Sequence, residues 1–249
     1  MHRCLCCCCF SGENSGSERQ PLLQARESDL NEAASARQIQ PTGSVKAMRR
    51  TGKVVIKRVG VPELDQRFSD MAETFNEQLE HYEAMARHIW NLRRSCSCVH
   101  GDTLAFTECV GKIREEYQAT YRVCLKMKGY DFSLIVVPVG SEGEREEEPL
   151  PPILKLAQDE LRGASKSARA TMSRGTKLKE LLNWLLHSRD QMAEQVKQVA
   201  PSYQEHGRLK TNLDENMREV KRAKELSVRY RERAAEVLNE AAQIAGSYS

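Results

Sequence analysis

The residues best suited to covalent chemistry are five cysteines that lie within the first nine positions of the chain. They are flanked by Leu5 and Phe10, and they are Cys4, Cys6, Cys7, Cys8 and Cys9. Thiols on an accessible, apolar-flanked terminus near a basic residue are substrates for S-palmitoylation. A single acyl chain holds a protein at a membrane only marginally, so stable anchoring takes two signals. We therefore interpret this cluster as an acyl-anchor site.

Other uses of these thiols stay open, and so does a tail whose cysteines carry no modification. A thiolate metal site needs ligands that converge from a folded frame, which neighbouring cysteines on a tail supply poorly. A disulfide framework needs cysteines spaced through a small secreted domain behind a signal peptide, which we do not expect here. We do not expect N-myristoylation, because His2, not glycine, follows Met1. Clustered thiols favour the reducing cytosol.

The stretch that follows, up to residue 45, is rich in small and polar residues without a sustained period, so we expect a disordered tail over 1–45. Inside it, Glu18 is followed after three residues by Leu22 and Leu23. This pattern resembles the acidic dileucine sorting signal of endosomal and lysosomal cargo. It is short and arises often by chance, so two leucines without a sorting role are the alternative.

Residues 46–61 form a basic leader that contains no acidic residue. Its cations are Lys46, Arg49, Arg50, Lys53, Lys57 and Arg58. A basic residue at an anionic leaflet contributes roughly 1 kcal/mol, so the leader favours contact with a membrane surface. The same stretch contains three consecutive branched residues, 54–56, which are also typical of a short strand or of a helix start.

Helical patterns fill residues 62–246 in two halves, 62–130 and 151–246, which a linker over 131–150 joins. The linker carries an acidic run closed by three prolines. We predict an all-α fold: an elongated antiparallel helical bundle or coiled coil, preceded by the disordered tail. One short β-like pair is the only sheet that we expect.

The strongest helical signals lie near the two ends of this region. Apolar residues recur every three or four positions from Leu64 to Leu92, as on the buried face of a helix. A heptad pattern runs from Leu213 to Ile244 with small residues at many core positions. Small residues bury little area each, so this helix needs partners on its flanks. These come from the same chain or from a second copy, which makes a homodimer one expectation.

The middle of the chain is harder to assign. A second helix is predicted from Asp102, through Tyr121 and Cys124, to about Gly129. Residues 132–139 are apolar and β-like, and they end near a proline. We expect them either to pair with the leader or to pack as an extended segment.

A second basic stretch lies between Leu161 and Lys179, where no acidic residue occurs. Its cations at helical spacing are Arg162, Lys166, Arg169 and Lys177. Unpaired charges are costly to bury, so we expect these side chains to face solvent. They form either a solvated helix face or a surface that contacts a membrane or an acidic partner.

No residue pattern points to catalysis, so we expect no catalytic residues, cofactor or metal. The chain lacks a phosphate-binding glycine loop, a nucleophile elbow and an HExxH motif. A second group of possible metal ligands consists of Cys96, Cys98, His100 and Cys109. They lack the paired CxxC spacing of structural zinc sites, so we favour a turn between two helices over a metal site. A formal net charge of +3 does not indicate nucleic acid as a partner.

The segment Lys53–Val59, followed by Leu64-Asp65-Gln66-Arg67-Phe68, resembles the opening of BAR domains of the amphiphysin type. The resemblance covers residues 53–245. It implies a homodimer whose basic patches contact curved anionic membranes. The layout of the tail is similar to that of the lipidated anchor subunits of lysosomal signalling scaffolds.

Together these patterns favour a non-enzymatic peripheral membrane adaptor or tether. We expect S-acylation to hold it on the cytosolic face of an endomembrane, where the helical bundle assembles protein partners. Endosomes or lysosomes are favoured, with the Golgi or plasma membrane as alternatives. The alternative function is a BAR-like module that binds or shapes curved membranes.

Overall fold

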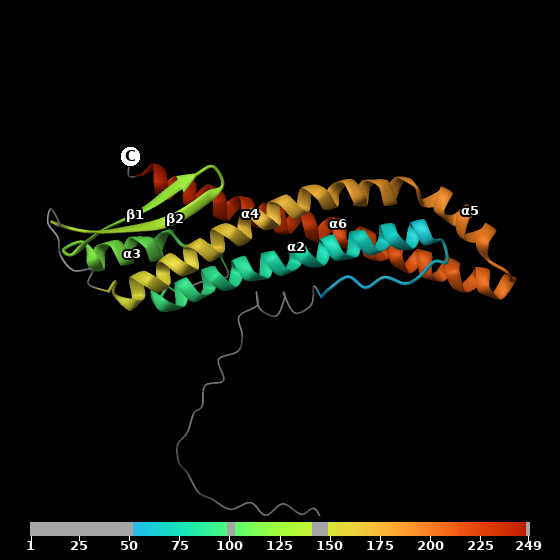
Figure 1. The fold of residues 1–249 in the computed structure, drawn as a ribbon, viewed down its shortest axis with the longest axis horizontal. Helices are drawn as coiled ribbons and strands as arrows, with labels where there is room; N and C mark the ends of the chain where they lie inside the picture. The colour runs from blue at the N-terminus through green and yellow to red at the C-terminus, as the bar shows by residue number, and fades with distance from the viewer. Residues whose placement is uncertain (1–51, 99–102, 141–148, 248–249) are drawn as a thin grey trace, which may run out of the picture. The chain divides into compact units, whose positions relative to one another are not determined.

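The computed structural model describes residues 52–98, 103–140 and 149–247. The five N-terminal cysteines, the dileucine pattern, Lys46, Arg49, Arg50 and His100 lie outside these residues. The described part is dominated by three long helices, α2 (Pro62–Ser95), α4 (Pro152–His187) and α6 (Tyr203–Gly246) (Figure 1). The shorter elements are α3 (Thr107–Tyr117), β1 (Tyr121–Lys128), β2 (Asp131–Pro138) and α5 (Arg189–Val199).

Helix α4 packs antiparallel to both α2 and α6. Leu92 near the end of α2, Leu154 near the start of α4 and Ile244 near the end of α6 share one core cluster. Leu64 and Leu182 share a second cluster, toward the opposite ends of their helices. The predicted mostly helical, antiparallel bundle is confirmed. None of the helices in the described ranges contains an apolar stretch long enough to cross a membrane.

The two strongest sequence patterns form the buried faces of α2 and α6. On α2 the apolar stripe from Leu64 to Leu92 lies in the core, and Pro62 occupies the first helical turn, where its missing N–H costs nothing. On α6 every heptad position from Leu213 to Ile244 is buried. Tyr230 of this seam stacks on Tyr82 of α2 with ring centroids 4.4 Å apart, so partners within the chain cover the seam.

The predicted second helix ends earlier than the sequence indicates. Helix α3 stops at Tyr117, and residues 121–138, part of which we assigned to the linker, form an antiparallel hairpin. Tyr121 and Cys124, predicted on a helix, therefore lie in β1. Buried residues alternate with exposed ones along β1, and Gly129 with φ 62° provides the glycine-first turn that two-residue hairpins favour.

Strand β2 pairs with β1 and not with the leader. The described leader residues are extended, and asparagine side chains take the place of a partner strand. Val54 N–H donates to Asn76 Oδ1 at 2.8 Å, and Lys57 N–H donates to Asn216 Oδ1 at 2.8 Å. Asn216 Nδ2 returns a bond of 2.7 Å to the carbonyl of Lys57. These bonds explain why the α6 seam tolerates a buried asparagine.

Candidate functional site

The β-hairpin is held on the bundle by side chains that hydrogen bond to its two edges. On the β2 edge, Phe132 N–H donates to Ser165 Oγ at 2.9 Å, and Gln158 Nε2 donates to the Leu134 carbonyl at 3.1 Å. Helix α4 supplies both of these side chains. The unpaired N–H and C=O groups of a strand edge can pair with another chain. Here α4 covers one such edge.

The other edge and the inner face of the hairpin are also anchored. Arg114 of α3 donates from Nε to the Val123 carbonyl of β1 at 3.2 Å. Phe132 is buried and stacks on Phe106 with ring centroids 5.8 Å apart. The hairpin therefore has a defined position on α4, and its side chains and those of the helix have a fixed spatial relationship.

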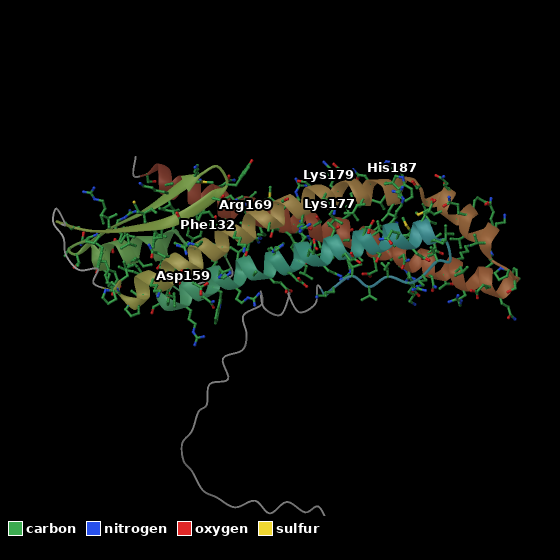
Figure 2. All side chains as sticks on the ribbon, viewed as in Figure 1. Phe132, Asp159, Arg169, Lys177, Lys179 and His187 are labelled. Carbon is green, nitrogen blue, oxygen red and sulfur yellow. The ribbon has the colours of Figure 1, made fainter. Side chains whose placement is uncertain are left out.

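A hollow of about 630 Å³ lies between the hairpin and α4, and we call it the basic hollow. Five cationic side chains line it, two from β1 and three from α4: Lys126, Lys128, Arg162, Lys166 and Arg169. The uncharged lining residues are Met127, Phe132, Ser133 and Ser165, and Asp131 is the one carboxylate among the lining residues. Five cations and one carboxylate give the lining a net charge of +4. Phe132 and Arg169 mark its position in Figure 2.

Two of the five cations contact carboxylates. Arg169 Nη1 lies 2.5 Å from Asp131 Oδ2, and Arg162 Nη1 lies 3.6 Å from Asp159 Oδ1. All four side chains are more than half exposed, so these pairs contribute little to stability. In the described ranges no ion pair involves Lys126, Lys128 or Lys166, so the basic hollow holds an excess of positive charge.

The four α4 cations predicted from the sequence, Arg162, Lys166, Arg169 and Lys177, all face solvent, which confirms that expectation. The first three meet in the basic hollow. Lys177 follows Arg169 by eight residues, about 12 Å along the helix axis, and is not among the lining residues (Figure 2).

Sequence reasoning missed Lys126 and Lys128 because it assigned them to a helix. The signal that identifies them is the alternation along β1. Val123 and Leu125 are buried, whereas Arg122 and Lys126 are exposed, which is the pattern of a strand with one solvated face.

The described cations of the leader lie elsewhere and are largely paired. Lys53 Nζ lies 2.7 Å from Glu80 Oε1, and Lys57 Nζ lies 2.5 Å from Glu215 Oε2, whereas Arg58 is exposed. The hydrogen bond from Lys53 lowers the pKa of Glu80 and in turn raises the pKa of Lys53. Carboxylates of the bundle thus offset the charge of this part of the leader.

A thiol cluster connects the end of α2 to α3. Cys98 and Cys109 are buried, Cys96 is half-buried, and Cys98 Sγ donates to the Cys96 carbonyl at 3.3 Å. A hydrogen bond from Cys109 lowers the pKa of Cys96 to about 7. Arg93 supports the turn by donating to the carbonyls of Cys98 and Thr103. Within the described ranges, no three His, Cys, Asp or Glu side chains are arranged to hold a metal ion.

Comparisons with known proteins add no relative to this picture. No protein-family model matches the chain, and neither the curated proteins nor the solved structures contain a match.

Proposed function

We propose that this protein is a non-enzymatic peripheral membrane adaptor or tether on the cytosolic face of an endomembrane. The observation that carries the proposal is the basic hollow, where three lysines with no ion pair in the described ranges and two weakly paired arginines converge. Acyl chains on Cys4, Cys6, Cys7, Cys8 and Cys9 provide the anchor, and the hollow provides a second contact with the anionic surface.

The acyl chains and the basic hollow make separate contributions to the free energy of membrane binding. One acyl chain gives marginal, reversible binding, and each cation near an anionic leaflet adds roughly 1 kcal/mol. Where only one cysteine is acylated, a net charge of +4 turns marginal attachment into stable attachment, and where two or more are acylated the acyl chains hold the protein by themselves. The cationic contribution is screened by salt, whereas the acyl contribution is not.

The rest of the bundle is available to protein partners. The end of the bundle around the α5–α6 connection lies away from the hairpin and exposes Val199 and Tyr203 (Figure 1). An adaptor of this kind contacts the membrane with one end and a partner with the other. The dileucine pattern at Glu18, Leu22 and Leu23 favours endosomes or lysosomes over the Golgi or plasma membrane.

A BAR-like curvature module is the second candidate. The observation that favours it is the length of the three packed helices, which have 34, 36 and 44 residues. It requires a homodimer and predicts that the purified chain tubulates anionic vesicles. Binding of vesicles by a monomer, without change of vesicle shape, favours the adaptor.

The experiment is co-sedimentation of the full chain, produced in bacteria and therefore not acylated, with phosphatidylcholine vesicles containing or lacking phosphatidylserine. We expect salt-sensitive binding to the anionic vesicles. Replacing Arg162, Lys166, Arg169 and Lys177 by glutamine weakens this binding and leaves the melting temperature nearly unchanged. The matched control replaces four exposed lysines elsewhere, Lys179, Lys210, Lys221 and Lys224, and retains binding. Equal binding by both variants contradicts the proposal.

A further inference from the structure

We infer that the basic hollow is a binding site for a compact group that carries two or more phosphomonoesters, as does the headgroup of a polyphosphorylated phosphatidylinositol. This inference rests on the proposed membrane function and narrows it from anionic surfaces in general to one class of headgroup.

The concave shape of the site favours a multiply charged ligand. Cations that are spread over a flat helix face attract an anionic membrane according to its average charge density, without regard to the kind of headgroup. Here Lys126 and Lys128 come from a strand and Lys166 comes from a helix, and the three line one concave site. A multiply charged group inside the hollow contacts several cations at once, whereas a singly charged headgroup contacts few of them.

The frame of the hollow is held in place by a buried hydrogen bond. The bond from Phe132 to Ser165 is buried, and it fixes the strand that faces the α4 cations. Because the frame is already positioned, a ligand orders only the ends of lysine and arginine side chains when it binds. Preorganisation of this kind favours a discrete ligand over diffuse attraction.

The two arginines of the hollow are suited to bind phosphate. Guanidinium groups bind phosphate oxygens in a bidentate manner, and ammonium groups bind them as point charges. The contacts of Arg169 with Asp131 and of Arg162 with Asp159 are exposed, so both arginines exchange a carboxylate for a phosphate at little cost. Ser133, which also lines the hollow, adds a hydroxyl donor.

Two sources supply this chemistry, a phosphoinositide in a membrane and a soluble inositol polyphosphate. Tyr130 favours the membrane source. It lies at the hairpin turn between Lys128 and Asp131, and 68% of its surface is exposed. Tyrosine side chains partition to the headgroup level of bilayers, so Tyr130 is suited to enter the interface beside a bound headgroup.

The test compares vesicles of equal total negative charge, supplied either by phosphatidylserine or by phosphatidylinositol bisphosphate. The full chain from bacteria is measured by co-sedimentation, and soluble inositol hexakisphosphate is titrated into it by calorimetry. We expect tighter binding to the bisphosphate vesicles. Replacing Lys126, Lys128 and Lys166 by glutamine weakens this binding roughly a hundredfold, about fivefold for each lysine. The control variant, with Lys179, Lys210 and Lys224 replaced by glutamine, keeps the preference.

The outcomes separate the inference from the function on which it rests. A lipid ligand is supported if the chain binds the bisphosphate vesicles more tightly than the phosphatidylserine vesicles and if the lysine variant loses this preference. Saturable binding of the soluble polyphosphate, lost in the same variant, with no vesicle preference supports a soluble ligand of the same chemistry. Equal binding to the two charge-matched vesicles, without saturable polyphosphate binding, overturns the inference but leaves the membrane function standing. Absence of binding to any anionic vesicle or to the polyphosphate overturns both.

Discussion

The backbone amide of Phe132 donates a 2.9 Å hydrogen bond to Ser165 Oγ, and both residues are almost completely buried. This contact joins the edge of β2 that does not pair with β1 to α4, and it sets the position of the hairpin over the cations of the helix.

Changing Ser165 to alanine leaves the Phe132 N–H buried without its acceptor, so we expect a loss of about 1–3 kcal/mol in the free energy of unfolding. The control is Ser173 to alanine on the exposed face of the same helix, which should change stability by less than about 0.5 kcal/mol. Urea unfolding followed by circular dichroism measures both. Equal stability of the two variants shows that the contact does not anchor the hairpin.

Changing Asp131 to asparagine removes the carboxylate from the basic hollow and raises the net charge of its lining from +4 to +5. Its pair with Arg169 is exposed, so stability should change by less than about 0.5 kcal/mol. Binding to anionic vesicles should tighten about fivefold. Asp190 to asparagine, on α5, makes the same change in net charge away from the hollow. Equal tightening in both variants means that total charge, and not the hollow, determines binding.

Gly163 lets α4 approach α2 closely. A Cβ at this position would lie 2.5 Å from the His88 ring. Glu160 holds this ring in place, because its Oε2 lies 2.6 Å from His88 Nδ1. Gly163 to alanine should therefore destabilise the bundle by about 1–3 kcal/mol through overpacking. Gly207 on α6 faces open space, so alanine there should stabilise by up to about 1 kcal/mol. Thermal melts of the two variants should shift in opposite directions, and a stabilised Gly163 variant contradicts the packing.

The thiol of Cys96 should react at a lower pH than an ordinary cysteine. Its pKa is lowered to about 7, and the largest cause is the hydrogen bond from Cys109. The reactive thiolate forms as the pH rises through this value, so alkylation by iodoacetamide should be half-maximal near pH 7. In the Cys109 to alanine variant the midpoint should move up toward the ordinary value of about 8.5. Mass spectrometry with fragmentation resolves Cys96 from its neighbours, and an unchanged midpoint in the variant contradicts this account.

Much of the helical frame could be predicted from the sequence, because burial on α2 and α6 repeats over many turns. The hairpin could not be predicted, because Tyr117, Tyr121 and Cys124 follow one another at the spacing of residues on one face of a helix. The site was predicted only in part, since the helical period places Arg162, Lys166 and Arg169 on one face. Asp131 lies 38 residues before Arg169, and no local pattern in the sequence brings it or the β1 lysines to α4.

The central claim, that acyl chains on the N-terminal cysteines hold this protein on membranes, is tested most directly by fractionating cells that express it. Membranes are pelleted after a high-salt wash, which screens contacts made by basic residues. We predict that the wild-type chain stays in the pellet. We predict that the variant with Cys4, Cys6, Cys7, Cys8 and Cys9 changed to serine moves to the supernatant. A cysteine variant that remains fully in the washed pellet contradicts the claim.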